Sequence, residues 1–147
     1  MKRHCAASAL ALAVLIASIV PAVAAPESLL LTRARLEALA AFGREPKFTR
    51  NDKEFYFGAP TEAVRARCQA RVDLLVTNLH KSLPSHPTKT FVLSQMQVML
   101  DSASSEDSEE RDQTLTYMER ILDILGIESS DGLLNKWRYG FDPKRAP

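Results

Sequence analysis

Cysteine and histidine are scarce in this 147-residue chain, which contains two of the first and three of the second. Cys5 lies in a leader that we expect to be removed, so Cys68 remains alone and no internal disulfide can form. Cys68 and His80 are twelve residues apart on one predicted helix, about 18 Å along its axis, so the two side chains cannot form a catalytic dyad. We expect Cys68 to be a small buried side chain, with an intermolecular disulfide as the alternative.

Metal-binding and catalytic motifs are also missing. His80 and His86 could pair across a turn, but no further cysteine or histidine is present to complete a zinc site. The acidic run 104–112 lacks the glycine and the alternating ligands of a calcium loop. There is no nucleophile elbow, phosphate loop or haem motif, and no carboxylate interrupts an apolar face as a glycosidase acid would. We therefore expect no metal, no cofactor and no enzymatic activity.

Neither sign of charge is in excess, because 19 basic and 18 acidic side chains give a net charge of +1. A near-neutral chain lacks the basic footprint of a nucleic-acid-binding protein, so we expect no nucleic-acid partner. The charges are nevertheless segregated, since 101–131 holds ten acidic and two basic residues. Glu106, Asp107, Glu109 and Glu110 could form a docking surface for a basic protein. Alternatively, they complement a helix dipole on a solvated face.

The single long apolar run lies at the start of the chain. Lys2 and Arg3 precede the apolar stretch 6–20, and small residues follow it up to Ala24. This pattern is typical of a secretory signal peptide, and a run of about 15 residues is short for a membrane span. We expect residues 1–24 to be cleaved, no stable membrane anchor, and a single domain over 25–147 that is periplasmic or secreted.

The rest of the chain shows no convincing strand pattern. Apolar residues recur at helical spacing in four segments that are bounded by threonine, glycine and proline. We predict helices over Glu27–Phe42, Thr61–Leu83, Thr88–Ala103 and Ser105–Leu125, and a short fifth helix over Asp131–Tyr139. Thr61 is expected to be an N-cap, Gly43 a C-terminal cap, and Gly126 the end of the fourth helix. The fold class is all-α, an antiparallel four-helix bundle with a long loop between helices 1 and 2.

Aromatic residues are concentrated in two segments. Seven of the ten lie in the link 43–60 or near the C-terminus: Phe48, Phe55, Tyr56, Phe57, Trp137, Tyr139 and Phe141. An 18-residue link is longer than a helix–helix connection needs, so we expect it to be functional or to be packed by its own side chains. The aromatic residues could pack together as a cap on one end of the bundle. The alternative is an exposed patch that binds a partner through Phe55, Tyr56, Trp137 and Tyr139.

One cation lies at the edge of the longest apolar stripe. That stripe runs along the predicted helix Thr61–Leu83, and Arg71 is placed just beside it. Because a guanidinium in this position needs a carboxylate partner, we interpret Arg71 as a member of a structural ion pair. The alternative is a clamp for an anion or for a carboxylate of a partner.

The segment Ser129–Pro143, with the sequence SSDGLLNKWRYGFDP, reads as a short capped helix that can dock on the bundle through Leu133, Leu134 and Trp137. It resembles the closing signature of a family of small bacterial exported helical domains of unknown function. That resemblance implies no activity. In size, export and helical build the chain is also similar to periplasmic immunity proteins, which is an analogy of architecture alone.

Three functional hypotheses remain. The first is an exported, non-enzymatic helical domain that binds another protein, for example as an inhibitor or an immunity protein. The second is a protein that binds or processes cell-wall fragments in a cleft between the 43–60 loop and the C-terminal segment, where Arg50, Tyr56 and Tyr139 could converge. The third is a structural homodimer, so both a monomer and a homodimer are kept open.

Overall fold

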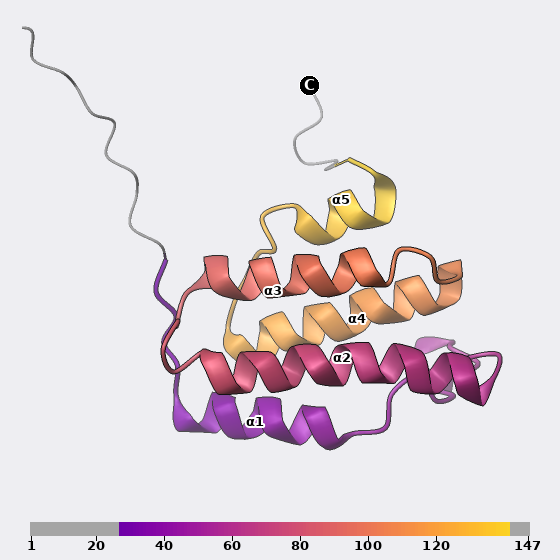
Figure 1. Cartoon of the computed structure of the whole chain (residues 1–147), viewed down its shortest axis with the longest axis horizontal. Helices are drawn as coiled ribbons and strands as arrows, with labels where there is room; N and C mark the ends of the chain where they lie inside the picture. The colour runs from indigo at the N-terminus through magenta and orange to yellow at the C-terminus, as the bar shows by residue number, and fades with distance from the viewer. Residues whose placement is uncertain (1–26, 142–147) are drawn as a thin grey trace, which may run out of the picture.

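The structure is a computed structural model that describes residues 27–141. Its elements are α1 (Arg33–Arg44), η1 (Asp52–Glu54), α2 (Glu62–Ser82), α3 (Lys89–Ser102), α4 (Ser108–Leu125) and α5 (Leu133–Tyr139). Helices α1 to α4 lie side by side with successive helices running in opposite directions, and α5 lies against α3 and α4 (Figure 1). The predicted all-α fold, with its short fifth helix, is confirmed. The expected leader, 1–24, lies outside the described residues.

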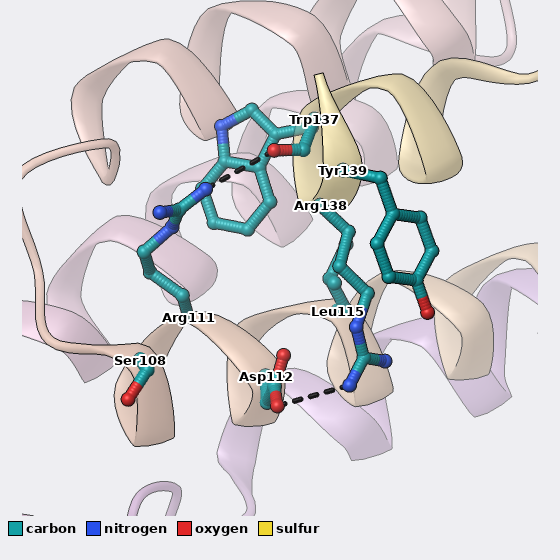
Figure 2. Close-up of a pocket in the computed structure, with 7 residues that line it drawn as sticks. All are labelled: Ser108, Arg111, Asp112, Leu115, Trp137, Arg138 and Tyr139. Atoms are coloured by element: carbon teal, nitrogen blue, oxygen red, sulfur yellow. Dashed lines mark hydrogen bonds and ion pairs between the residues drawn. The ribbon is translucent and has the colours of Figure 1, made fainter. Parts of the chain in front are cut away.

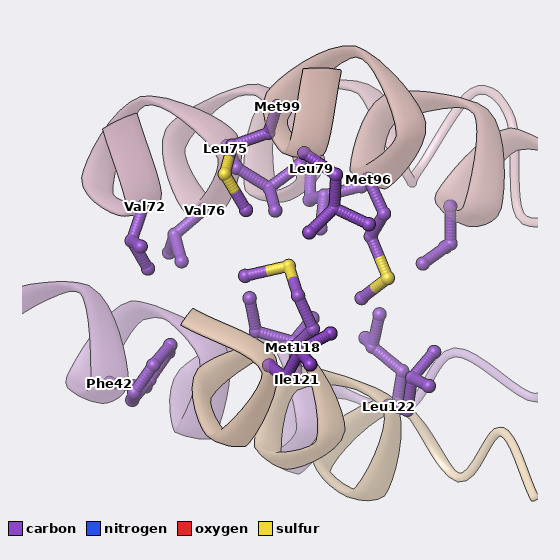
Figure 3. Close-up of a cluster of buried hydrophobic side chains, with 14 of the residues drawn as sticks. Phe42, Val72, Leu75, Val76, Leu79, Met96, Met99, Met118, Ile121 and Leu122 are labelled. Carbon is purple, nitrogen blue, oxygen red and sulfur yellow. The ribbon is translucent and has the colours of Figure 1, made fainter. Parts of the chain in front are cut away.

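The core lies where α2 and α3 face α1 and α4 (Figure 3). Its fully buried side chains include Leu39, Phe42, Val72, Leu79, Met96, Leu100, Met118, Ile121 and Leu125. Methionine side chains lie between the two helix pairs, where flexible thioethers can fill irregular gaps. Cys68 is also buried, as expected for a small apolar side chain. Within 27–141, none of the helices combines the length and the apolar character needed to cross a bilayer.

Threonine side chains begin the first three helices. The hydroxyls of Thr32, Thr61 and Thr88 each accept a hydrogen bond from a backbone N–H three residues later, at 3.2 Å in all three cases. This is the usual way of satisfying a free donor at a helix N-terminus. The predicted cap at Thr61 is therefore confirmed.

The predicted start of the first helix at Glu27 is wrong, because α1 begins only after Thr32. The backbone before it is extended and pairs with the turn between α2 and α3. The N–H of Leu29 donates to the carbonyl of Pro87 at 2.7 Å, and the N–H of Lys89 donates to the carbonyl of Glu27 at 3.1 Å. These long-range bonds give the segment an alternative to helical bonding that the apolar spacing could not reveal.

Gly43 does not cap α1, contrary to the sequence prediction, because α1 continues to Arg44. A Cβ atom at position 43 would lie 3.0 Å from Cγ1 of Val76. The glycine thus permits close approach of α1 to α2. Gly126 does end α4 as predicted, with a left-handed φ of 69°.

A buried lysine fixes the end of α1. Lys47 is wholly buried, and its ammonium donates to the carbonyls of Phe42 and Glu45 at 2.8 and 3.0 Å. A third bond goes to the carboxylate of Asp73 on α2, at 2.7 Å. These acceptors use all three ammonium protons, and the cation lies where the negative end of the α1 dipole favours it.

The link beyond Lys47 is packed by its own side chains, which is one of the two possibilities expected from its length. The ring of Phe48 is buried and meets Tyr117 of α4 edge-on, with ring centroids 5.1 Å apart. The backbone N–H of Phe48 donates to the Tyr117 hydroxyl at 2.8 Å. The side chain of Tyr56 is buried as well, so two aromatic anchors hold the link on the bundle.

Lys47→Met keeps most of the apolar volume but removes the ammonium, and with it three hydrogen bonds to the carbonyls of Phe42 and Glu45 and to the carboxylate of Asp73. We expect the free energy of unfolding, measured with urea at pH 7, to fall by about 3 kcal/mol. Lys53→Met removes the same charge from the exposed turn η1 and should change it by less than about 0.5 kcal/mol. Equal effects of the two substitutions would contradict the role given to Lys47.

Candidate functional site

The acidic residues at the start of α4 do not form one exposed face, contrary to the predicted docking surface. Glu106 precedes the helix, and its side chain is only 6% exposed. It accepts hydrogen bonds from Arg67 at 2.7 and 2.9 Å and from Arg71. The expected ion pair of Arg71 is therefore present. The bonds from Arg67, followed by those from Arg71, lower the pKa of Glu106 from its ordinary 4.5 to about 2.

Glu110 is 2% exposed, although the sequence suggested a solvated residue. Its helical face also carries Thr114, Met118 and Ile121, so the carboxylate is carried into the core side of α4. The hydroxyl of Tyr56 donates to it at 3.2 Å. Burial, followed by the charge of Glu110, raises the pKa of Tyr56. Of the four acidic candidates, only Asp107 and Glu109 are exposed.

The aromatic residues do not form one closed cap. Among the described residues, no ring contact joins the 48–57 segment to the 137–141 segment. Each segment packs on α4 separately, which leaves Phe55 89% and Phe57 74% exposed. Tyr139 and Phe141 are exposed as well and contact each other. The expectation of a common cap is thus wrong, and exposed aromatic surface remains in both segments.

A small cleft separates α4 from α5 (Figure 2). This α4–α5 cleft is lined by Ser108, Arg111, Asp112, Leu115, Trp137, Arg138 and Tyr139, and its volume is about 190 Å³. The guanidinium of Arg111 lies 4.6 Å from the centroid of the Trp137 ring and donates to the Trp137 carbonyl at 3.1 Å. The indole N–H of Trp137 donates to the carbonyl of Leu100 at 2.9 Å. These contacts dock α5 on the bundle.

A second hollow adjoins the first along α4, beside the turn that carries Phe55. We call it the Phe55 groove; it is lined by Glu54, Phe55, Tyr56, Phe57, Glu109, Asp112, Gln113, Thr116 and Arg138. Its volume is about 320 Å³. Asp112 and Arg138 line both hollows, and their ion pair of 3.0 Å separates the groove from the α4–α5 cleft.

The fold and these two hollows can be set against known proteins. The profile of the domain of unknown function DUF4844 matches residues 31–142. The chain belongs to the DUF4844 family. The predicted resemblance to a family of unknown function through 129–143 is thereby confirmed, and the match covers nearly all of the helical region.

A solved structure is also similar to this DUF4844 protein. It is the crystal structure of a DUF3571 family protein from Acinetobacter baumannii AYE, with 31% sequence identity and a TM-score of 0.62. The alignment covers 72% of the present chain and 89% of the other one. Among curated proteins, no match is found.

Cys68 and His86, considered from the sequence for chemistry, lie in separate places in the DUF4844 protein. Cys68 is buried, and this burial raises the pKa of its thiol to about 11. A disulfide through Cys68 would therefore require opening of the core. His86 stacks on Phe91 near the turn after α2, away from both hollows. No group of three or more metal-ligating side chains occurs within 27–141.

The three polar side chains considered for a cell-wall fragment do not converge in this DUF4844 protein. Tyr56 directs its hydroxyl to Glu110, and Arg50 pairs with Asp52 at 2.7 Å. Tyr139 lines the α4–α5 cleft and not the Phe55 groove.

Three residues of the hollows were missed by the reasoning from sequence: Arg111, Asp112 and Arg138. Arg111 is the single basic residue within the acidic run 104–112, and Arg138 lies between Trp137 and Tyr139. An isolated cation in an acidic run and a cation between two aromatic residues were the available signals. Their pairing across α4 and α5 required the tertiary structure.

The ion pairs of Glu106 make a prediction about pH. Because its pKa is depressed in the folded protein, its stabilisation is complete above about pH 4.5 and is lost as the pH falls toward 2. We expect Glu106→Gln to lower the free energy of unfolding by about 2 kcal/mol at pH 7. The gap between wild type and variant should close between pH 5 and 2 in urea titrations. Glu109→Gln is an exposed control, and its free energy of unfolding should differ from that of the wild type by an amount that does not change with pH. A difference between Glu106→Gln and the wild type that stays constant from pH 7 to pH 2 would contradict the ion pair.

Proposed function

We propose that this DUF4844 protein is an exported, non-enzymatic binding domain that holds a partner protein at the Phe55 groove, as an inhibitor or immunity protein would. Export is supported by the signal-peptide pattern of residues 1–24. A binding role is supported by exposed aromatic side chains next to a hollow.

The proposal rests mainly on the exposure and the backbone conformation of Phe55. A phenylalanine that is 89% exposed gains nothing for the fold from burial. It also has a left-handed φ of 53°, a conformation that costs a side-chain-bearing residue about 1–2 kcal/mol. Strained residues of this kind cluster at functional sites. Large aromatic side chains are also the commonest anchors of protein interfaces.

The turn 51–56, which carries Phe55, is held by hydrogen bonds within the chain itself. Asn51 and Tyr56 exchange backbone hydrogen bonds of 2.8 and 3.1 Å, and the Asn51 side chain accepts from the N–H of Lys53 at 3.2 Å. Next to this turn, Tyr56 is anchored in the core side of α4 by Glu110. A prepared turn reduces the entropy that binding would otherwise cost. The groove therefore has the features of a preformed docking site.

Phe55→Gly separates binding from folding. Removing the ring should weaken partner binding by about 2 kcal/mol, or roughly 30-fold. The same change relieves the left-handed φ and should raise the free energy of unfolding by about 1 kcal/mol. Binding is measured by capture from a periplasmic extract with a photo-reactive phenylalanine at position 57, and unfolding is measured with urea.

Leu30→Gly is the matched control, because Leu30 is 75% exposed and precedes α1, outside the Phe55 groove. It should leave the captured protein and its amount unchanged. Capture that survives Phe55→Gly undiminished, or that falls equally with Leu30→Gly, would refute the proposed function.

A further inference from the structure

We infer that the Phe55 groove recognises an arginine side chain of the partner. The inference rests on the proposed function and adds the chemistry of the partner to it. It is based on three features of the groove: unpaired carboxylates, a free aromatic face, and a recurring arrangement of arginine elsewhere in the fold.

The groove carries an excess of negative charge. Three carboxylates line it, from Glu54, Glu109 and Asp112, against the single cation of Arg138. Arg138 is already paired with Asp112. Glu54 accepts only a neutral amide bond, from Gln113 at 3.2 Å, and Glu109 has no ion pair within the described region. Two carboxylates therefore face the groove without a cation, which favours a basic ligand.

The same turn shows how an arginine can be held. The guanidinium of Arg50 lies 5.8 Å from the centroid of the Phe57 ring and pairs with Asp52 at 2.7 Å. The cation is thus placed between an aromatic face and a carboxylate. Phe55, two residues before Phe57, is more exposed and has no cation over its ring among the described residues.

This arrangement recurs at two further places in the fold. In each, an arginine lies over an aromatic ring and also forms an ion pair with a carboxylate. The distance from the guanidinium to the ring centroid is 4.8 Å in the first and 5.5 Å in the second, and the ion pairs measure 2.7 and 3.0 Å. The two sets are Arg120 with Phe42 and Glu45, and Arg138 with Tyr139 and Asp112. In the Phe55 groove, a ring and two carboxylates without a cation are present, and among the described residues no arginine lies over the ring of Phe55.

The geometry favours arginine over lysine. A guanidinium is planar, so it can stack on an aromatic ring while its edge bonds a carboxylate with two N–H groups. An ammonium retains the charge but not the stacking. The volume of about 320 Å³ is at the lower end of the roughly 300–1,000 Å³ of ligand pockets, which suits one or two side chains.

The test uses three acetylated, amidated pentapeptides that carry arginine, lysine or citrulline between glycines. They are titrated into the isotope-labelled full-length protein and followed by backbone amide shifts. The arginine peptide should shift amides of 54–57 and 109–113, and should bind about fivefold more tightly than the lysine peptide and about tenfold more tightly than the uncharged citrulline peptide. Glu54→Gln combined with Glu109→Gln should weaken it by about tenfold.

Asp123→Asn combined with Glu128→Gln is the matched control, since it removes the same charge from exposed residues that do not line the groove. It should leave arginine binding within about twofold, because charges separated by more than a Debye length are largely screened. Equal binding of the citrulline peptide, shifts confined to other surfaces, or an unchanged affinity in the groove variant would overturn the inference.

The two proposals can fail separately. If the arginine peptide does not bind while partner capture still depends on Phe55, the inference of arginine recognition is wrong and the proposed function stands. If the arginine peptide binds in the groove but Phe55→Gly captures as much partner protein as the wild type does, the arginine preference stands and the proposed function is wrong.

Discussion

The buried ammonium of Lys47 is the contact on which the position of the link and of the Phe55 groove depends. The ammonium donates hydrogen bonds to the carbonyls of Phe42 and Glu45 at the end of α1. It also donates to the carboxylate of Asp73 on α2. The chain is thereby directed over the bundle, where Phe48 and Tyr56 dock on α4. The exposed turn is therefore a consequence of buried polar contacts. Without them, the link between α1 and α2 would lose the contacts that offset the entropy cost of holding it in one conformation.

Helix α4 organises the rest of that region, because different faces of it meet different segments. One face fills the core with Met118 and Ile121. The N-terminal end of the same face holds Tyr56 through Glu110, while Tyr117 binds Phe48 and Arg111 docks α5. The two aromatic segments meet this helix, and no ring contact joins them among the described residues. This explains why their exposed rings lie beside separate hollows, with the Asp112–Arg138 pair between them.

Local patterns in the sequence predicted the helices well. Threonine caps, glycine ends and helical spacing gave the class of fold and most helix boundaries, because these depend on neighbours along the chain. The extended start before Thr32 was missed, since its hydrogen bonds go to Pro87 and Glu27 pairs with Lys89 across the fold. The role of Gly43 was missed for the same reason. The side chain that leaves no room for a Cβ atom at position 43 is Val76, which is remote in sequence.

The residues of the candidate site could be singled out from the sequence only in part. The link, its exposed Phe55 and the exposed Glu109 were among the residues singled out. The sequence could not distinguish these from Glu106 and Glu110, because all the acidic residues near the start of α4 look alike as a run of charge. Their burial is decided by helical phase and by arginines on α2, which only the packing reveals.

The central claim is that the turn is rigid in the free protein. Amide hydrogen exchange of the free protein tests it at Asn51, Tyr56 and Ala59, whose N–H groups are bonded within the link at 2.8, 3.1 and 3.0 Å. The account predicts that these amides exchange at least about 100-fold more slowly than in an unstructured chain, as expected where opening costs some 3 kcal/mol. Exchange at the rate of an unstructured chain would contradict it, because the turn would then lack a fixed conformation in the free protein.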